Sequence, residues 1–444
     1  MLRFGTDGVR GVALRDITTH AVQLYARAAA RELRCSLIVL GFDTRESSEQ
    51  LARAVEAGFI AEGVEVLWAG MCPTPTIAFF AEHCQAGAAV ITASHNPYSD
   101  NGLKFFGEGG IKLSDEQESR IQKTYELLVQ SETAEVANSG VGEVALDLDA
   151  YCAHISASVV GVDTKIKVVI DCANGAMSEV APQVFKKLGV TPSFIHCTPN
   201  GKNINESCGA AHPESLVKEV IRSKADLGIA FDGDGDRIIA VDGNGEVVNG
   251  DQLIALFALQ LKARNSLANN TVAVTVMTNM GFHIAMQNAG INVVTTPVGD
   301  RSILLALHEA KACLGGEQSG HIVFTQHATT GDGLLAAVQL LSVLHSRQQS
   351  LHEASQEVMT SLPQVLINVS ILGGAQSQDL LTKHHAAISE VEKLLGGKGR
   401  VLVRPSGTEP LIRVMVEAET SAEAKKYAEQ IAQILSPSAP AQGR

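Results

Sequence analysis

Three aspartates alternate with glycines directly after an apolar run, as Asp232-Gly233-Asp234-Gly235-Asp236. Carboxylates this close repel one another, and a bound cation offsets that repulsion. Because oxygen is the only donor type among them, the pattern favours a hard cation, with Mg²⁺ first. An EF-hand is excluded, since its sixth and twelfth positions would fall on Arg237 and Gly243. The sequence therefore predicts one Mg²⁺ site here, against the alternative of an exposed acidic turn.

A serine lies in a turn of small and polar residues, Thr92-Ala93-Ser94-His95-Asn96-Pro97. A hydroxyl at the end of a strand can act as a nucleophile or carry a phosphoryl group. The hydrolase elbow Gly-x-Ser-x-Gly does not fit, because Thr92 and Asn96 stand where it needs glycines. A Ser-His-Asn-Pro turn also occurs without any catalytic role. This motif alone leaves both readings open.

A third polar segment, Arg404-Pro405-Ser406-Gly407-Thr408-Glu409-Pro410, combines a guanidinium, hydroxyls and a flexible glycine. Arg404, Ser406, the Gly407 backbone and Thr408 are suitable donors for a phosphate, and Arg413 lies further along. A simple loop between two strands explains the composition equally well.

A fourth polar segment, Gly316 to His321, offers a carboxylate in Glu317, a hydroxyl in Ser319 and the imidazole of His321. These groups suit sugar hydroxyls, and a histidine can move a proton near neutral pH. Four cations also stand beside glycine-rich turns. Taken singly, each is an ordinary surface charge: Arg10, Lys104, Arg237 and Arg301.

These segments need a scaffold, and the chain shows one plan three times. A short apolar run is followed by a polar turn, a helical stretch ending near a glycine, and a second extended segment. This alternation predicts βαβ units and mostly parallel sheets. The first strands are expected at Ser36–Leu40, Ile166–Ile170 and Val272–Val276, and the helix-ending glycines are Gly63, Gly189 and Gly290.

Each unit then supplies a further strand, and each of these strands leads into a polar segment described above. The strands are Ala88–Thr92 before Ser94, Leu227–Phe231 before the aspartates and Ala312–Leu314 before Glu317. Because ligands of open α/β sheets bind at the carboxyl ends of strands, we expect the three loops to face one central cleft.

Beyond Pro363 the pattern changes to extended segments around a polar helical stretch, and then a helix that opens with the capping box Thr420-x-x-Glu423. The predicted fold is three similar mixed, mostly parallel α/β sheet domains plus a C-terminal α+β domain. The expected boundaries are 1–152, 153–250, 251–363 and 364–444.

The composition of the chain argues against nucleic acid and membranes as partners. The chain has 444 residues, 45% of them hydrophobic, and 35 basic against 48 acidic residues give a net charge of −13. Such a charge gives no bulk attraction for nucleic acid or an anionic membrane. No segment approaches the roughly 20 apolar residues of a membrane span, and the start lacks a secretory pattern. The eight scattered cysteines contain no CxxC pair, so we expect a reduced, cytoplasmic protein.

A hydroxyl nucleophile, a hard-cation loop, a polyol-binding loop and a phosphate-binding loop together indicate phosphoryl transfer on a phosphosugar. In combination and order, the motifs resemble the α-D-phosphohexomutase superfamily, and most closely its bacterial phosphoglucosamine mutase group. The resemblance runs from Leu2 to Leu435. It is carried by Phe4–Gly11, the Ser94 loop with Asp100–Phe106, Asp171–Ala176, Asp232–Arg237, Val298–Arg301, Gly316–His321, Thr330–Gly333 and Arg404–Pro410.

The resemblance implies that Ser94 is phosphorylated and that Mg²⁺ is held by its phosphate with Asp232, Asp234 and Asp236. It implies interconversion of glucosamine 6-phosphate and glucosamine 1-phosphate through a bound 1,6-bisphosphate, which feeds UDP-N-acetylglucosamine and cell-wall synthesis. Further implied roles are proton handling by Lys104 and His321, and stabilisation of transferring oxygens by Arg237. Phosphate contacts are implied for Arg10, Arg404, Ser406, Gly407, Thr408 and Arg413, and sugar contacts for Glu317, Ser319 and Arg301.

The implied partners are a phosphosugar, a priming kinase or bisphosphate sugar, and a second copy in a homodimer. Two alternatives stay open. A phosphomannomutase/phosphoglucomutase would share the mechanism and differ in its sugar. A non-catalytic phosphosugar-binding protein would not need the Ser94 nucleophile.

Overall fold

The computed structural model describes residues 2–5, 7–131, 146–370, 377–405 and 411–436. Internal contacts divide the chain into two compact units. The larger unit contains residues 1–277 and 289–358, and the smaller contains residues 278–288 and 359–444. Each unit is described by itself.

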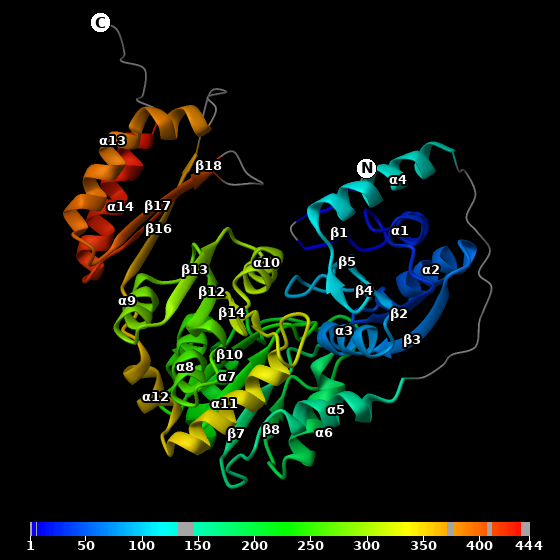
Figure 1. Cartoon of the computed structure of the whole chain (residues 1–444), viewed down its shortest axis with the longest axis horizontal. Helices are drawn as coiled ribbons and strands as arrows, with labels where there is room; N and C mark the ends of the chain where they lie inside the picture. The colour runs from blue at the N-terminus through cyan, green and yellow to red at the C-terminus, as the bar shows by residue number, and fades with distance from the viewer. Residues whose placement is uncertain (1, 6, 132–145, 371–376, 406–410, 437–444) are drawn as a thin grey trace, which may run out of the picture. The chain divides into compact units, whose positions relative to one another are not determined.

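The first sheet of the larger unit has the order β1-β5-β4-β2-β3, with β6 paired to β5. Its strand β2 pairs in parallel with β3 and β4, whereas β5 is antiparallel to β4 and β1. Helices α1, α2 and α3 flank its strands (Figure 1). The elements are β1 Val9–Val12, α1 Thr19–Leu33, β2 Leu37–Phe42, α2 Ser48–Ala61, β3 Glu65–Met71, α3 Thr74–His83, β4 Gly87–Ile91, β5 Asp100–Gly107, β6 Ile111–Lys112 and α4 Asp115–Ser131.

The second sheet has the order β11-β10-β9-β7-β8. Here β7 is the strand with two parallel neighbours, β8 and β9, and β10 returns antiparallel to β9. The elements are α5 Leu148–Ala157, β7 Val168–Asp171, α6 Met177–Lys187, β8 Ser193–Ile195, α7 Glu214–Ser223, β9 Leu227–Phe231, β10 Ile238–Asp242 and β11 Val247–Val248.

The third sheet has the order β13-β12-β14-β15, with β12 parallel to both neighbours and β15 antiparallel to β14. Its elements within the larger unit are α8 Gly250–Ala263, the 3-10 turn Ala268–Asn270, β12 Thr271–Thr275, β13 Asn292–Thr296, α10 Asp300–Ala310, β14 Leu314–Gly316, β15 Ile322–Phe324, α11 Gly333–Arg347 and α12 Leu351–Val358.

The three sheets thus share one plan, and the predicted mixed α/β architecture is confirmed. Strands β4, β9 and β14 take the same place in their sheets, and each turns through a hairpin into an antiparallel strand, β5, β10 or β15. The Ser94, Asp232–Asp236 and Glu317–His321 segments are these three hairpin loops. The sequence analysis did not predict the antiparallel strands β5, β10 and β15 that follow these loops.

Local sequence explains why these elements form. Every residue of β7, β9 and β12 is buried, as their continuous apolar runs require in a sheet covered on both faces. Gly63, Gly189 and Gly290 follow α2, α6 and α9 (Met280–Asn288) with φ of +77°, +72° and +62°. Glycine adopts this left-handed conformation without a steric cost, so it suits the end of a helix, as predicted.

The smaller unit contains a three-stranded antiparallel sheet in the order β16-β18-β17. Helices α13 and α14 lie side by side against this sheet (Figure 1). The predicted helix cap is confirmed, because the Thr420 hydroxyl accepts a hydrogen bond from the Glu423 N–H at 3.2 Å. The elements are α9 Met280–Asn288, β16 Gln364–Ser370, α13 Ser377–Leu395, β17 Arg400–Pro405, β18 Leu411–Glu417 and α14 Ser421–Leu435.

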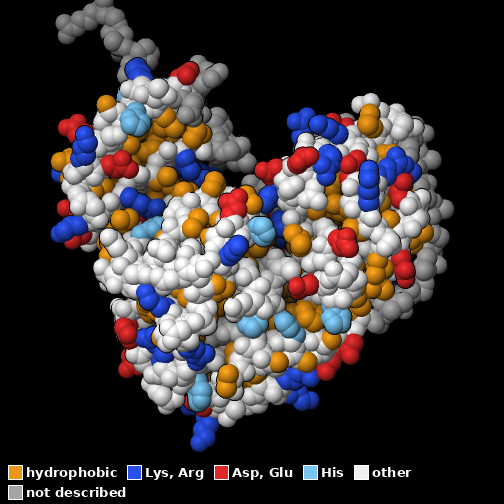
Figure 2. Space-filling model, viewed as in Figure 1, with side chains coloured by type: hydrophobic (Ala, Val, Ile, Leu, Met, Phe, Trp, Pro, Cys, Tyr) orange, Lys and Arg blue, Asp and Glu red, His pale blue; other side chains and the backbone are white. Residues whose placement is uncertain are grey.

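Acidic and basic side chains are interspersed on the face of the molecule drawn in Figure 2, with hydrophobic side chains between them. Among the described residues, no helix has both the length and the apolar character needed to cross a membrane.

Candidate active site

Ser94 lies just beyond the end of β4 in a constrained backbone conformation. Its φ is +51°, in the left-handed region that serine rarely adopts. Two side chains fix this turn by donating to the same pair of carbonyls, those of Ser94 and Asn96. Arg45 Nη2 donates at 3.1 and 2.6 Å, and Asn205 Nδ2 donates at 2.9 and 3.0 Å. These bonds offset the strain and hold the Ser94 side chain in one direction.

The Ser94 hydroxyl is buried and faces the acidic loop. Its Oγ donates to Asp232 Oδ2 at 2.6 Å, so the loops of the first and second sheets meet at this contact. The neighbouring His95 has a pKa lowered to about 4, because burial, and then Arg237 and Arg10, disfavour its cationic form. His95 Nδ1 lies 3.3 Å from Ser94 Oγ and is uncharged near neutral pH.

Asp232, Asp234 and Asp236 are buried, and one oxygen from each lies within 4.8 Å of the others. Burial and the charges of Asp236 and Asp234 raise the pKa of Asp232 well above its usual range. Asp234 Oδ1 is buried and accepts no hydrogen bond. Asp236 Oδ1 is likewise buried and accepts no hydrogen bond. A converging set of oxygens with two such acceptors fits a hard divalent cation. The residues present therefore suit the Mg²⁺ site predicted from the sequence.

Lys104 supplies the positive charge that balances this loop. Its Nζ lies 2.9 Å from Asp234 Oδ2, 3.4 Å from Asp236 Oδ2 and 2.8 Å from Asp7 Oδ2. Burial lowers the pKa of Lys104, but the three carboxylates outweigh it and raise the pKa above its ordinary value. Burial also opposes ionisation of Asp236, yet the charges of Lys104, His321 and Arg237 keep its pKa low. Lys104, on the strand that follows the Ser94 loop, is therefore an ammonium ion that contacts the aspartate loop.

Two of the predicted arginines, Arg10 and Arg237, contact different loops of the site. Arg10, on β1, donates from Nη1 to the Ala93 carbonyl at 3.2 Å and to Asn96 Oδ1 at 3.4 Å. Arg237 follows the aspartates, and its Nε lies 3.6 Å from Asp236 Oδ1. Burial lowers the pKa of Arg237, but the charges of Asp236, Asp232 and Glu317 outweigh burial and raise the pKa above its ordinary value.

His321 faces the same carboxylate from the third loop, with Nδ1 3.7 Å from Asp236 Oδ2. Burial lowers its pKa, and the contact with Asp236 raises it above the ordinary value. The Gly331 N–H donates to Nε2 at 3.2 Å, and this hydrogen bond opposes protonation of Nε2. A proton on Nε2 would break this hydrogen bond, so Nε2 is the acceptor of the ring. The exchangeable proton then lies on Nδ1 and faces Asp236.

The third loop is held against the second by close backbone contact. The Ile238 N–H donates to the Gly320 carbonyl at 3.0 Å, and a Cβ on Gly320 would lie 1.9 Å from the Ile238 carbonyl oxygen. Only glycine fits this approach. Glu317 accepts a hydrogen bond from the Gly299 N–H at 2.9 Å, and Ser319 is exposed at the tip of the loop.

Arg301 points elsewhere in this structure. Its guanidinium forms ion pairs with Asp115 and Glu118 at the start of α4. It lines a cavity of about 510 Å³ together with Arg3, Gly299 and other residues. Neither Ser94 nor the aspartates line this cavity, so the structure does not bring Arg301 to the transfer residues.

The predicted phosphate loop belongs to the smaller unit. Arg404 on β17 is paired directly with Arg413 on β18, so two cationic residues stand opposite each other across the strands. Like charges in this arrangement repel, and a bound anion would offset the repulsion. Ser406, Gly407 and Thr408 lie outside the described residues.

Four domain families match the chain in order. They are phosphoglucomutase/phosphomannomutase alpha/beta/alpha domain I at residues 1–131, domain II at 149–245, domain III at 249–362 and the C-terminal domain at 366–434. The phosphoglucosamine mutase of Pelotomaculum thermopropionicum is 46% identical over 445 residues, covering 97% of this chain and 98% of the relative. The chain belongs to the phosphoglucomutase/phosphomannomutase family. A second member of this family, the phosphoglucosamine mutase of Frankia alni, is 44% identical and covers 99% of both chains.

Two solved structures share the fold of this chain. A phosphoglucomutase/phosphomannomutase family protein from Burkholderia thailandensis superposes with a TM-score of 0.82 at 25% identity, covering 97% of this chain and 96% of that one. The N-acetylphosphoglucosamine mutase of Aspergillus fumigatus, solved with GlcNAc-6P and magnesium, gives 0.69 at 18% identity and covers 98% and 95%. The second likeness shows the fold alone.

Sequence reasoning missed several residues that hold the site of this family member together. Asp7 joins Lys104 to Lys112, and the Thr74 hydroxyl donates to Asp234 Oδ2 at 2.7 Å. Arg45 and Asn205 clamp the Ser94 turn as described. For Arg45 a signal was present, because Asp43-Thr44-Arg45 follows β2 at the same edge of the sheet. Asn205 lies in an irregular segment, and its position carries no comparable signal.

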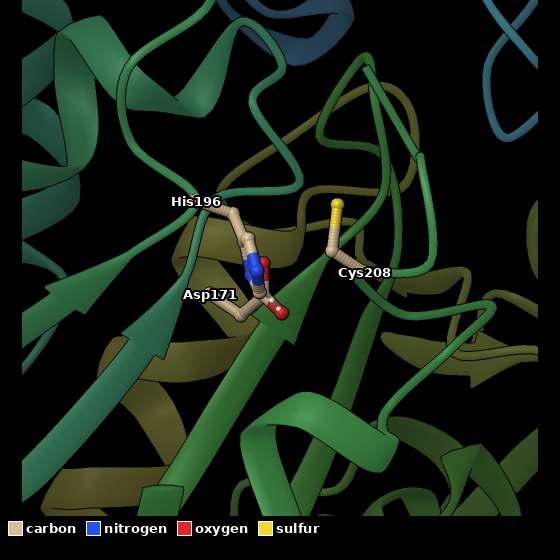
Figure 3. A group of neighbouring side chains, drawn as sticks. All are labelled: Asp171, His196 and Cys208. Atoms are coloured by element: carbon tan, nitrogen blue, oxygen red, sulfur yellow. Dashed lines mark hydrogen bonds and ion pairs between the residues drawn. The ribbon is translucent and has the colours of Figure 1, made fainter. Parts of the chain in front are cut away.

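Two other groups of potential metal ligands occur among the described residues: Asp171, His196 and Cys208, and Asp242, Glu246 and His352. Figure 3 shows the His196 imidazole beside the Asp171 carboxylate, and the Cys208 sulfur lies within 4.8 Å of a ligand atom of each. Asp171 accepts from the Ala173 N–H at 2.8 Å and from the Gly209 N–H and His196 Nδ1 at 3.0 Å. Because these donors already satisfy Asp171, we interpret this group as a structural tie at the end of β7 in the family fold.

Proposed function

We propose that this chain interconverts glucosamine 6-phosphate and glucosamine 1-phosphate through a phosphorylated Ser94 and a bound glucosamine 1,6-bisphosphate. The observation that carries the proposal is the 2.6 Å contact of Ser94 Oγ with Asp232 Oδ2, inside a buried group of three carboxylates. The relatives named phosphoglucosamine mutase, at 44–46% identity, support the choice of sugar.

The proposed resident cation is one Mg²⁺, held by Asp232, Asp234, Asp236 and the phosphate on Ser94. A phosphoserine adds about −1.5 to −2 charge to these carboxylates, so a divalent cation is needed for balance. When bound, Mg²⁺ would draw charge from the oxygens of the transferring phosphoryl group. The unpartnered Asp234 Oδ1 supports this ligand set.

The first step transfers the phosphoryl group from Ser94 Oγ to the free hydroxyl of the bound sugar phosphate. The bond from phosphorus to Ser94 Oγ breaks and a bond to the sugar oxygen forms. The sugar hydroxyl loses a proton and the Ser94 oxygen gains one, so the serine hydroxyl is restored. After the bisphosphate has turned round, Ser94 Oγ attacks its other phosphate and restores the phosphoenzyme. Arg237 stabilises negative charge on the transferring oxygens, and Arg10 contacts the phosphate from the Ser94 side.

We assign the proton transfers to Lys104 and His321. The raised pKa of Lys104 keeps it cationic, which suits the side that donates a proton. His321 carries its exchangeable proton on Nδ1, beside Asp236. In this proposal Glu317, Ser319 and Arg301 hold the sugar, and Arg301 must first leave Asp115 and Glu118.

The phosphate that is not reacting is assigned to Arg404, Ser406, Gly407, Thr408 and Arg413. The direct pairing of Arg404 with Arg413 supports an anion site on this sheet. Priming of Ser94 by a bisphosphate sugar or a kinase, a homodimer and a cytoplasmic location complete the proposal. Priming and the homodimer rest on the family resemblance, and the location rests on the scattered cysteines.

The testing experiment compares turnover of glucosamine 6-phosphate, mannose 6-phosphate and glucose 6-phosphate, with Mg²⁺ and a catalytic amount of sugar 1,6-bisphosphate. We expect a preference for glucosamine of tenfold or more in kcat/KM, about 1.4 kcal/mol of transition-state discrimination. A preference for mannose or glucose would overturn the substrate and keep the mechanism. No turnover of any of them by enzyme phosphorylated on Ser94 would overturn the mutase proposal.

A further inference from the structure

Two cysteines that the proposed reaction does not use lie together in the second sheet. Cys172 follows the end of β7, and Cys197 follows the neighbouring parallel strand β8. The two strands stay in contact past their last paired residues, because the Cys172 N–H donates to the Ile195 carbonyl at 3.2 Å and the Asn174 N–H to the His196 carbonyl at 2.6 Å. The backbone therefore brings the two positions side by side.

Cys172 and Cys197 lie close enough that each thiol shifts the pKa of the other. Their surroundings differ. Cys172 is fully buried, whereas Cys197 is partly exposed and its Sγ lies 3.7 Å from the Ser178 carbonyl oxygen. Interaction with the Cys172 thiol, opposed in part by burial, lowers the pKa of Cys197 to about 7. The same interaction, and then burial, raise the pKa of Cys172. One thiol is accessible and ionises readily, and its neighbour is protected.

We propose that Cys197 is a site of reversible oxidation by hydroperoxides, and that Cys172 resolves the oxidised sulfur into an intramolecular Cys172–Cys197 disulfide. A reactive thiol needs thiolate character, access for the oxidant and a partner thiol within reach. The strand ends and the proximity of the two thiols meet these conditions. Cys208, the third cysteine of this region, is buried, and burial raises its pKa to about 12.

The chemistry balances with a hydroperoxide as oxidant. The Cys197 thiolate attacks the terminal peroxide oxygen, so an S–O bond forms, the O–O bond breaks, and the leaving alkoxide or hydroxide takes up a proton. Sulfur is oxidised by two electrons and the peroxide is reduced by two. Cys172 then attacks the Cys197 sulfenic acid. An S–S bond forms, the S–O bond breaks, and water leaves with the Cys172 proton. A dithiol reductant reverses the product by thiol–disulfide exchange.

The position of Cys172 gives this modification a route to the proposed active site. The Ala173 carbonyl, one residue on, accepts from the Asn205 N–H at 2.9 Å, and Asn205 clamps the Ser94 turn. The Ala176 N–H donates to the Gly233 carbonyl at 2.9 Å, within the aspartate loop. A disulfide at Cys172 shifts this segment and both loops with it. We expect turnover to fall on the order of tenfold, a consequence that rests on the proposed function.

The test treats the full-length, reduced protein with a small excess of hydrogen peroxide and maps its thiols by peptide mass spectrometry. We expect loss of two of the eight free thiols, a linked peptide that joins Cys172 to Cys197, and full recovery with a dithiol. In Cys172→Ser, dimedone should trap a sulfenic acid on Cys197. Cys197→Ser should keep Cys172 reduced, and the matched control Cys84→Ser should form the disulfide like the parent chain.

A disulfide between other cysteines, or equal thiol loss in Cys197→Ser and the parent chain, would overturn the proposal. So would Cys197 sulfenic acid that persists in the parent chain while Cys172 stays reduced. Turnover is assayed on the same samples. If the reduced protein is inactive on all three sugar phosphates, the proposed function fails while the thiol map still decides the modification.

Discussion

The Ser94 loop and the Asp232–Asp236 loop occupy the same position in two copies of one architectural plan. Each joins the third strand of its βαβ unit to an antiparallel return strand. Their internal support is different. The Ser94 turn is strained, at φ +51°, and depends on donors from Arg45 and Asn205. The aspartate loop depends on charge balance from Lys104 and on glycines that permit close approach.

The difference shows how one scaffold can hold two unlike chemical groups in contact. A Cβ on Gly233 would lie 2.7 Å from the Ser94 carbonyl oxygen, so the two loops pack backbone to backbone. This approach brings Ser94 Oγ to Asp232 Oδ2. The strands fix where the loops meet, and the loop residues decide whether a hydroxyl or a set of carboxylates is presented.

The largest expected effect on the two loops comes from Ser94→Ala, which removes the hydroxyl from the first loop and leaves the carboxylates of the second. If Ser94 is the phosphoryl carrier, turnover should fall by a factor on the order of 10⁴ or more. Binding of glucosamine 6-phosphate, followed by calorimetry, should change little. The exposed Ser99 in the same loop supplies the control, and Ser99→Ala should keep turnover within about twofold. Unchanged turnover in Ser94→Ala would contradict the proposal that Ser94 carries the phosphoryl group.

The next effect concerns the aspartate loop. Asp234→Asn removes one negative charge from the group that contains the unpartnered Oδ1, and we expect turnover to fall roughly 10²- to 10³-fold. Because the variant holds a divalent cation less tightly, Mn²⁺ titration followed by electron paramagnetic resonance should show weaker binding.

Glu246→Gln is the matched control for Asp234→Asn. Glu246 belongs to another acidic group, with Asp242 and His352, and it is exposed. This variant should keep the Mn²⁺ affinity of the parent chain. Unchanged Mn²⁺ binding in Asp234→Asn would place the tight site outside the aspartate loop.

The sequence was sufficient to predict the repeated strands and the polar loops that follow them. Alternation of apolar runs with helical periodicity is a local signal, and β9 begins and ends at Leu227 and Phe231 as expected. A cation site was predicted at the three aspartates because their spacing along the chain already forces them together, and the structure shows the carboxylates clustered.

Contacts between loops could not be predicted in this way. Asn205 reaches Ser94 across 111 positions of sequence, and Lys104 reaches Asp234 across 130. Such pairs depend on how the sheets are placed, which local propensity does not encode. The direction of Arg301 was also beyond the sequence, because its ion pairs with Asp115 and Glu118 follow from the packing of α4.

A smaller effect tests the support of the Ser94 turn. Asn205→Ala removes two hydrogen bonds to the carbonyls of Ser94 and Asn96, each worth about 1 kcal/mol. Since Arg45 still donates to both carbonyls, we expect kcat to fall only about tenfold, with KM within about twofold. Steady-state kinetics measure both constants. Asn200→Ala, an exposed position in the same segment, should change neither constant. A higher KM with normal kcat would assign Asn205 to substrate binding.

The smallest effect concerns Asp332, a buried carboxylate of the third repeat that is supported by a hydroxyl and a backbone N–H. It accepts from the Tyr151 hydroxyl and from the Leu335 N–H, both at 2.9 Å. Burial raises its pKa to about 6, against about 3.9 in an unfolded chain. The folded state therefore binds this proton more tightly than the unfolded state does. The stabilisation is fully present below about pH 4 and is lost as the pH rises through 6.

Asp332→Asn removes that titration and keeps an acceptor at the start of α11. Between pH 5 and pH 8 the parent chain should lose about 1 kcal/mol more than the variant, a difference of about 2–4 °C in Tm by scanning calorimetry. The exposed Asp226, changed to asparagine, should follow the parent chain at both pH values. If Asp332→Asn also follows the parent chain, this carboxylate has the same pKa in both states. The contrast with the aspartate loop, where Lys104 balances the buried charge, would then not explain how Asp332 titrates.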